Sequence, residues 1–302
     1  MRSPEAVIEA AGLTKSYGRR RGIENVTFSV PRGEIFGFLG PNGAGKTTTI
    51  RVLLGFMRPQ KGGARVLGQP PRQTDRSRLG VVPGELSLFE HMTGAYLLDY
   101  LESLTGRPAI RRGALIERFA LSPADLRRPI RHYSRGMKQK LGIIQALQHD
   151  PELLVMDEPT EGLDPLMQQE FYGLLGELRA QGRTVFVSSH ILYEVERTCD
   201  RVAIIREGRL VATERIDDLR RRLARRVEAH FASAAEAAAF APPPGVTEED
   251  RQGSHVSMRV PLEHVNVVVR ALAERTLTDV VWERPSLEDI FLAYYRETAD
   301  AR

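Results

Sequence analysis

Short apolar runs recur along the first two thirds of the chain and alternate with segments of helical periodicity. Residues 35–39, 153–156 and 184–187 are mostly apolar, and polar or turn-forming residues bound each run. Such runs predict buried strands of a parallel sheet, and the amphipathic segments between them predict helices. The pattern therefore predicts an α/β protein with a mixed or parallel sheet at its core.

A different pattern follows Glu214. Strand-like residues 227–231, an alanine-rich stretch, alternating residues 255–260, helix-like residues 263–275 and strand-like residues 278–282 come in turn. This series is one strand short of a full βαββαβ order, which we take it to represent, and it predicts a small α+β domain of ferredoxin-like type. We expect two domains, residues 1–218 and 219–302, with a helical subdomain at about residues 84–145 of the first.

One basic run lies at the start of the second domain, where we expect an arginine-rich helix. Its members are Arg220, Arg221, Arg222, Arg225 and Arg226. A contact to phosphate or to anionic lipid is one interpretation, and a solvated helix face is the favoured one.

Composition narrows the class of protein. A hydrophobic fraction of 42% in 302 residues is enough to bury a core, and a net charge of +4 is too small to indicate a nucleic-acid partner. The single cysteine, Cys199, excludes an intramolecular disulfide, and we expect an inert buried thiol. No apolar run approaches the roughly 18 residues of a membrane helix, and the N-terminus lacks a signal-peptide pattern. We therefore expect a cytoplasmic protein.

A glycine-rich segment follows the first buried strand and fits the pattern G-x-x-x-x-G-K-[ST]. It consists of Gly40, Pro41, Asn42, Gly43, Ala44, Gly45, Lys46 and Thr47. Glycines in this pattern let backbone N–H groups surround nucleotide phosphates at a helix start. We expect Lys46 to reach the β- and γ-phosphates, Thr47 to bind Mg²⁺ and Thr48 to add a phosphate contact.

Two adjacent carboxylates end the apolar run 153–156. Asp157 and Glu158 would lie at the carboxyl end of a strand, which is the edge that faces the phosphates in such folds. We predict that Asp157 holds Mg²⁺ and that Glu158 polarises the attacking water. Alone, this pair would indicate a solvated strand end, but with the glycine-rich loop it indicates nucleotide hydrolysis.

Residues 133–140, with the sequence YSRGMKQK, precede this strand by about one helix. They resemble the signature of the ABC ATPases, in the form found among bacterial drug exporters. Ser134 and the backbone of Gly136 would open a helix whose positive end can meet a γ-phosphate, although Ser134 alone would indicate only a helix cap. The resemblance implies that Ser134, Arg135, Gly136 and Met137 contact the ATP of a partner chain.

Further matches to this family follow in the expected order. Tyr17 resembles the aromatic residue that stacks on adenine, and Gly162 to Pro165 resembles the segment in which Asp164 couples paired subunits. His190 resembles the histidine that contacts the γ-phosphate and acts in catalysis with Glu158 and Lys46. Residues 285–291 resemble the C-terminal ending of the bacitracin and daunorubicin resistance branch.

One position departs from the family pattern. Gly84 stands where the family has a glutamine that contacts Mg²⁺ and the attacking water, and Glu85 is the nearest polar residue. Two alternatives stay open. Glu85 faces the metal directly or through water, or it is merely exposed and water takes the place of the glutamine.

The resemblance implies an ATPase subunit of an ABC transporter with ATP and Mg²⁺ as cofactors. It implies a homodimer that encloses two ATP molecules, and residues from 84 to about 131 that transmit movement to a separate transmembrane permease. The protein would lie on the cytoplasmic face of the membrane, drive export of a drug-like or hydrophobic compound, and bind no nucleic acid directly. The alternatives are a soluble ABC ATPase acting on the ribosome or DNA, and a regulator without turnover, against which Glu158 and His190 argue.

Overall fold

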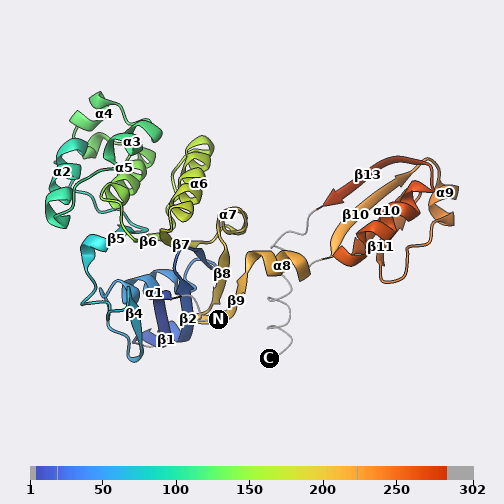
Figure 1. Cartoon of the computed structure of the whole chain (residues 1–302), viewed down its shortest axis with the longest axis horizontal. Coiled ribbons are helices and arrows are strands. Elements are labelled where there is room, and N and C mark those ends of the chain that lie inside the picture. The colour runs from blue at the N-terminus through green and yellow to red at the C-terminus, as the bar shows by residue number, and fades with distance from the viewer. Residues whose placement is uncertain (1–4, 19, 223, 284–302) are drawn as a thin grey trace. The chain divides into compact units, whose positions relative to one another are not determined.

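The chain divides into two compact units, with the boundary between Glu214 and Arg215. The structure is a computed structural model that describes residues 5–18, 20–222 and 224–283 (Figure 1). The first unit contains a six-stranded and a three-stranded sheet, the second contains a four-stranded sheet, and each unit has its own hydrophobic core.

The main sheet of the first unit has six strands in the order β5-β6-β7-β3-β8-β9. They are β3 (Ile35–Leu39), β5 (Leu79–Val82), β6 (Leu153–Asp157), β7 (Thr184–Ser189), β8 (Arg201–Arg206) and β9 (Arg209–Arg215). The pairs from β5 through β6, β7 and β3 to β8 are parallel. Every residue of β3, β6 and β7 is buried, which confirms the strands predicted from the apolar runs.

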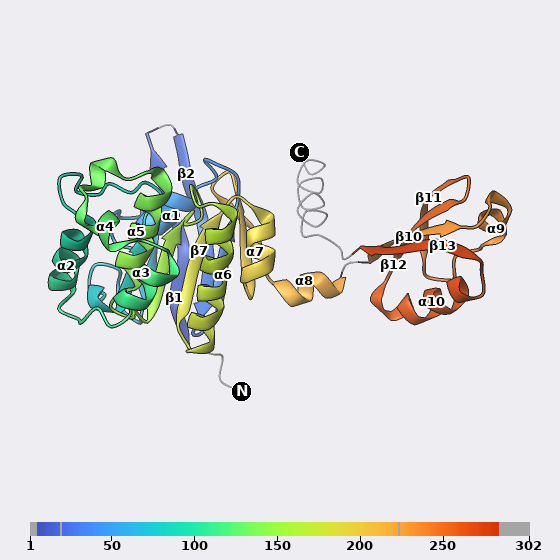
Figure 2. The ribbon, with the colours of Figure 1, turned by 90° about the horizontal axis from the view of Figure 1, so that it is seen from above.

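A second sheet of three antiparallel strands lies beside the first. It consists of β1 (Ala6–Tyr17), β2 (Arg20–Pro31) and β4 (Lys61–Val66) in the order β2-β1-β4. Phe28 of this sheet stacks on Phe36 and Phe186 of the main sheet, with ring centroids 5.6 and 5.8 Å apart. Helix α1 (Lys46–Leu53) adds Ile50, Val52 and Leu53 to this core. The two sheets and α1 share one hydrophobic core (Figures 1 and 2).

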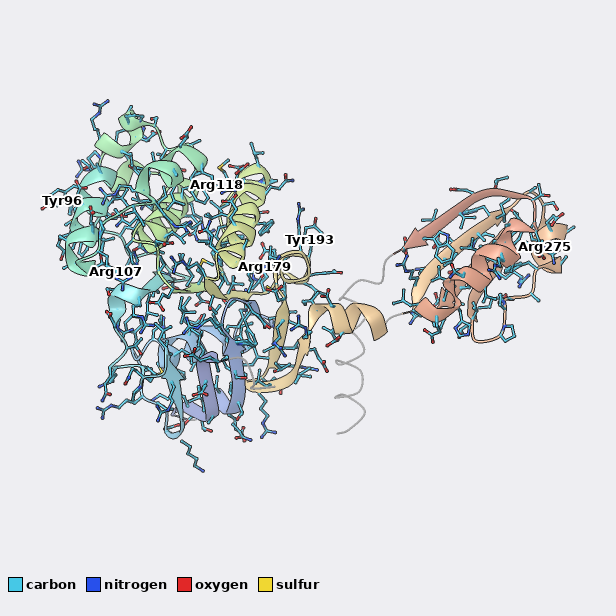
Figure 3. All side chains as sticks on the ribbon, viewed as in Figure 1. Tyr96, Arg107, Arg118, Arg179, Tyr193 and Arg275 are labelled. Carbon is cyan, nitrogen blue, oxygen red and sulfur yellow. The ribbon has the colours of Figure 1, made fainter. Side chains whose placement is uncertain are left out.

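Helices between β5 and β6 form a separate layer (Figure 1). They are α2 (Gly94–Thr105), α3 (Arg112–Arg118), α4 (Pro123–Arg127) and α5 (Arg135–Leu147), with the 3₁₀ turn η2 (Ile130–His132), and another such turn, η1 (Arg76–Arg78), precedes β5. Arg118 of α3, which is labelled in Figure 3, pairs with two glutamates of α6 (Pro165–Ala180), Glu170 at 3.1 Å and Glu177 at 2.8 Å. These helices form the helical part that the sequence predicts within the α/β fold.

Helix α7 (Leu192–Thr198) precedes the single cysteine. Cys199 is buried and packs against Gly37 of β3. A Cβ on Gly37 would lie only 2.9 Å from the sulfur of Cys199. Burial raises the pKa of the Cys199 thiol to about 12, which keeps it protonated and unreactive. The predicted burial of this thiol is confirmed.

The second unit has the βαββαβ order that the sequence predicts. After α8 (Ile216–Arg222) come β10 (Arg225–Phe231), α9 (Ala234–Ala239), β11 (Thr247–Gln252), β12 (His255–Val260), η3 (Leu262–His264), α10 (Val265–Ala273) and β13 (Leu277–Glu283). The strand order is β11-β12-β10-β13 and all three pairs are antiparallel. This is the ferredoxin-like arrangement.

Helices α9 and α10 pack on one face of the sheet of this unit. Val227, Ala229 and Phe231 of β10 join Ala237 of α9 and Val268 of α10 in a single core. Because side chains alternate along a strand, Glu228 and His230 lie on the opposite face.

The basic run is only partly helical. Arg225 and Arg226 belong to β10, not to the arginine-rich helix that the sequence predicts. The strand begins there because Arg225 and Arg226 pair with Val260 and Arg259 of β12, and pairing to a neighbouring strand overrides local helix propensity. The helix ends at Arg222.

Candidate active site

The glycine-rich loop joins β3 to α1 and packs against β8. A Cβ on Gly40 would lie 2.3 Å from the carbonyl oxygen of Ile205, so only glycine fits there. Gly45 has φ of 109° directly before α1 begins at Lys46, a conformation that favours glycine. The loop therefore presents the free N–H groups of a helix start, which is a site for an anion.

Lys46 is buried within this loop. Its Nζ donates to the carbonyl oxygens of Gly40 at 2.6 Å and Pro41 at 3.2 Å. It also lies 3.1 Å from Oε1 of Glu158, and its side chain is 4% exposed. The ammonium is thus held at the loop with a carboxylate as its partner.

Asp157 ends β6 beside the start of α1. Its Oδ2 accepts a hydrogen bond from Oγ1 of Thr47 at 2.7 Å, and its Oδ1 accepts one from Ser188. Hydroxyl and carboxylate oxygens are the ligands that Mg²⁺ prefers, so Thr47 and Asp157 form a donor set that fits this ion. Ser188 is a residue that the sequence did not single out, although Asp157 and Ser188 are register partners on parallel strands.

Glu158 has an unusual backbone conformation, with φ of 50°. Its N–H donates to the carbonyl oxygen of Ser188 at 3.2 Å and to Oγ of Ser188 at 3.1 Å. A left-handed non-glycine residue costs about 1–3 kcal/mol and persists where its surroundings fix it. The two bonds to Ser188 supply that constraint, and they aim the carboxylate away from the strand.

The carboxylate of Glu158 lies between a cation and an imidazole. Oε1 faces Lys46, and Oε2 is 2.8 Å from Nδ1 of His190. The side chain of His190 is 40% exposed, and that of Glu158 is 18% exposed. The structure therefore brings together three residues that the sequence assigned to catalysis.

A buried carboxylate braces the segments that carry Glu158 and His190. Glu194 of α7 accepts hydrogen bonds from Thr160 at 2.7 Å, Ser189 at 2.7 Å and Tyr172 at 3.1 Å. Burial, followed by the charge of Glu194, raises the pKa of Tyr172. The sequence did not reveal Glu194, because an acid in the first turn of a helix usually faces solvent and the helix dipole.

Tyr17 lies beside the start of α1. Its hydroxyl is 3.2 Å from Oγ1 of Thr48 and 3.3 Å from Sδ of Met57. The residue is 44% exposed. An exposed aromatic ring thus stands next to the phosphate-binding loop, where it is able to stack on a planar group.

A cleft of about 420 Å³ opens beside the Thr47 and Asp157 pair. Tyr17, Lys46 and His190 are not among the described residues that line it. Its lining includes Thr47, Asp157, Glu158, Gly84 and Glu85. A Cβ on Gly84 would lie 3.2 Å from Oδ2 of Asp157. The exposed Glu85 therefore shares the cleft with the Thr47 and Asp157 pair.

The segment 133–140 lies elsewhere. Ser134 caps α5, accepting from the N–H of Met137 at 3.2 Å, and a Cβ on Gly136 would lie 2.9 Å from the carbonyl oxygen of Gly162. Arg135 pairs with Glu161. None of residues 134–137 is among the described residues that line the cleft.

Asp164 is a helix cap in the single chain. Its side chain accepts from the N–H of Met167 at 3.0 Å at the start of α6. Residues 134–137 thus lie against Gly162. Glu161, the partner of Arg135, is part of the cleft lining, whereas residues 134–137 and Asp164 are not among the described residues that line it.

Comparison with known proteins gives consistent matches. The family model described as ABC transporter matches residues 23–161. An uncharacterized ABC transporter ATP-binding protein of Nostoc sp. (strain PCC 7120 / SAG 25.82 / UTEX 2576) is 42% identical over 203 residues, a match that covers 65% of this chain and 61% of that protein. The Nod factor export ATP-binding protein I of Paraburkholderia xenovorans (strain LB400) is 42% identical over 217 residues, which covers 69% of this chain and 71% of that protein.

One solved structure, described as the ATP binding subunit of an ABC transporter, aligns with a TM-score of 0.66 at 33% identity, over 71% of this chain and 92% of that one. Fold and loop geometry define a P-loop nucleotide-binding protein. The chain belongs to the family of ABC transporter ATP-binding proteins, which confirms the family predicted from the sequence. The relatives named above do not confirm the particular resistance branch, and residues 285–291, on which that prediction depends, lie outside the described residues.

Proposed function

We propose that this chain binds ATP with Mg²⁺ and hydrolyses it to drive a separate membrane permease. The observation that carries this proposal is the position of Glu158 between Lys46 and His190, next to the Thr47 and Asp157 pair. Thr47 and Asp157 would hold Mg²⁺, which supplies charge neutralisation at the phosphates when bound.

The protein's own residues then have separate tasks. The loop from Gly40 to Thr47 binds the phosphates through its N–H groups, and Lys46 places an ammonium beside them. Thr48 adds a hydroxyl, and the ring of Tyr17 stacks on the adenine. Glu158 orients a water and accepts its proton, while His190 holds Glu158 through Nδ1 and contacts the terminal phosphate.

A second copy of the chain would complete the site. The surface formed by Ser134 to Met137 and Asp164 is outside the cleft of its own chain, and it begins with the positive end of α5. We propose a homodimer in which this surface meets the ATP held by the partner's loop. Two ATP molecules would then be enclosed between the two chains.

Coupling to a permease follows from the family and from the helical layer. No helix in the described part of the chain has the length and hydrophobicity needed to cross a membrane. We propose that the protein lies on the cytoplasmic face of the membrane and that residues 84–131 contact a permease which exports a drug-like or hydrophobic compound. The relative named for Nod factor export supports the direction, and residues 285–291 favour the bacitracin and daunorubicin resistance branch.

Co-purification tests the transport proposal against action on the ribosome. The full chain is expressed with the membrane protein encoded by a neighbouring reading frame, and membrane and ribosome fractions are separated. We expect the chain in the membrane fraction, bound to that protein, with ATP turnover that increases when the two are reconstituted together. A chain that sediments with ribosomes and never with membranes would support the alternative.

Substitution of Glu85 tests whether this residue replaces the glutamine that the family has at the position of Gly84. If its carboxylate contacts Mg²⁺ directly or through water, Glu85→Ala raises the Mg²⁺ concentration for half-maximal ATP hydrolysis by about 10-fold or more, the effect of losing a group near a metal. The control is Glu117→Ala, which removes an exposed carboxylate outside the cleft. An unchanged Mg²⁺ dependence in Glu85→Ala would favour the alternative in which water takes the place of the glutamine.

A further inference from the structure

The open face of the second unit's sheet carries a cluster of two histidines and one glutamate. Glu228 and His230 lie on β10 and His255 on β12. His230 and His255 are direct register partners, and Glu228 is opposite Ser257, one step along the same face. Helices α9 and α10 pack on the other face of the sheet, so the cluster faces away from the core.

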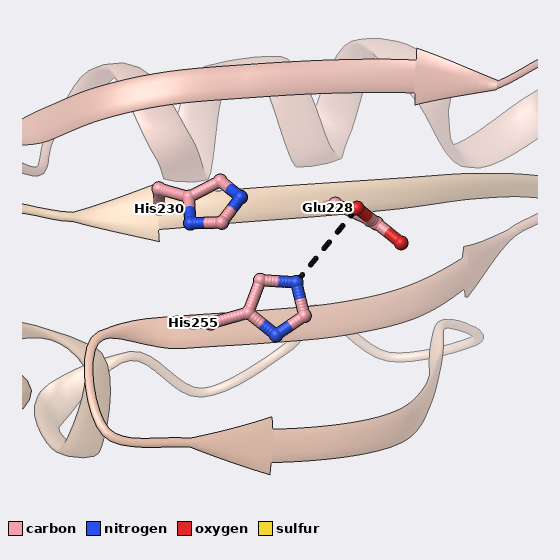
Figure 4. Close-up of side chains that lie close together, drawn as sticks. All are labelled: Glu228, His230 and His255. Atoms are coloured by element: carbon pink, nitrogen blue, oxygen red, sulfur yellow. Dashed lines mark ion pairs between the residues drawn. The ribbon is translucent and has the colours of Figure 1, made fainter.

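The geometry of the cluster is compact (Figure 4). One ligand atom from each residue lies within 4.8 Å of the other two. The imidazole ring centroids are 4.7 Å apart, and Nε2 of His255 is 3.9 Å from Oε2 of Glu228. Ligand atoms around a tetrahedral Zn²⁺ lie roughly 3.3 Å apart, so rotamer movements of about 1–1.5 Å would close the site.

The ligand atoms are accessible and have few other partners. Among the described residues, no hydrogen bond to either imidazole ring is present, and all three side chains are partly exposed. A metal ion can therefore enter from solvent and find ring nitrogens that are not already used. Imidazole binds such an ion only in its neutral form, so acid weakens the site.

The two carboxylate oxygens of Glu228 have different neighbours. Oε2 faces His255. Arg226 approaches the other oxygen, Oε1 of Glu228, at 3.4 Å, and also donates to Oγ of Ser257. A partner of this kind fixes the orientation of a metal-binding carboxylate. The exposed Asp279 of β13 is the register partner of His230.

We propose that Glu228, His230 and His255 bind one divalent transition-metal cation of the Zn²⁺ type. Two imidazoles and one carboxylate are a donor set that suits Zn²⁺ and related ions, not Mg²⁺ or Ca²⁺. Three protein ligands leave a fourth position for water or another molecule. This site is distinct from the Thr47 and Asp157 pair, and it does not depend on the proposed ATPase function.

Zinc titration of the metal-free full chain tests the site. Calorimetry of the wild type is compared with that of the double variant His230→Asn with His255→Asn. We expect the wild type to bind one more equivalent of Zn²⁺ than the double variant. Each single variant should bind this equivalent roughly 100-fold or more weakly, since loss of a group that merely orients a ligand costs about 10- to 100-fold.

Glu158 and His190 lie close enough together to bind Zn²⁺ themselves. Because the wild type and the double variant both keep that pair, the difference between their Zn²⁺ stoichiometries reports only the site on β10 and β12. The control is His91→Asn, which removes an exposed histidine far from β10 in the sequence and should keep the full stoichiometry. Zn²⁺ should raise the melting temperature of the wild type by more than it raises that of the double variant.

Equal Zn²⁺ stoichiometry in the wild type and the double variant would overturn the proposal. If the double variant fails to fold, Glu228→Gln keeps both histidines and the shape of the third side chain. Its affinity for Zn²⁺ should fall by about 10- to 100-fold, and an unchanged affinity would remove Glu228 from the site.

Discussion

Replacing Glu158 with Gln lowers the rate of ATP hydrolysis by about 10²- to 10⁴-fold while ATP still binds. Glutamine has nearly the same shape and is able to keep the contact with Lys46 as a neutral acceptor, but it cannot take a proton from water. The backbone at φ of 50° and its two bonds to Ser188 do not depend on the carboxylate. The loss should therefore appear in kcat and not in the Kd for ATP.

Phosphate release and ATP binding are measured separately on the same preparation of Glu158→Gln. Glu117→Gln makes the same chemical change at an exposed position outside the cleft and should leave both quantities unchanged. Turnover in Glu158→Gln equal to that of the wild type would exclude Glu158 as the base. A loss of ATP affinity as large as the loss of rate would assign it a structural role instead.

Replacing Lys46 with Ala removes most of the affinity for ATP. The substitution deletes a buried ammonium, and truncating one partner of a buried charge pair costs about 2–5 kcal/mol. That cost corresponds to roughly 30- to 4000-fold in Kd. The substitution also leaves Glu158 with His190 as its remaining partner in the described site. The negative charge of Glu158 would then face the negative charge of an entering triphosphate without a lysine between them.

Calorimetric titration with Mg²⁺ and ATP measures this effect. Lys61→Ala removes an exposed lysine from β4 and serves as the control, with no change in affinity expected. If Lys46→Ala bound ATP as tightly as the wild type, the residues from Gly40 to Thr47 would not be the phosphate-binding loop.

Much of the site was visible in the sequence because parallel strands bring their carboxyl ends to one edge. An apolar run ending in Asp157 and Glu158 and a glycine-rich loop after β3 must meet at that edge, and they do so through Thr47 and Lys46. The family resemblance added His190, which the structure places against Glu158. Local pattern and known topology were sufficient for these residues.

The supporting residues could not be predicted in this way. Glu194 gathers hydroxyl groups from Thr160, Tyr172 and Ser189, which are far apart in the chain and have no common motif. The helix predicted through Arg225 and Arg226 failed for a related reason, since pairing with β12 decides their conformation. The predicted βαββαβ order likewise does not specify the register that puts His230 opposite His255.

The contact between Lys46 and Glu158 makes nucleotide binding an exchange of partners. The ammonium that meets a phosphate must leave a carboxylate 3.1 Å away, so the measured free energy of binding is a difference between two charge pairs. In the proposed mechanism the arrival of the triphosphate and the release of the base are then one linked event. Glu158 pairs with Lys46 in the structure, and in the proposed mechanism its carboxylate is freed when that ammonium moves to a phosphate.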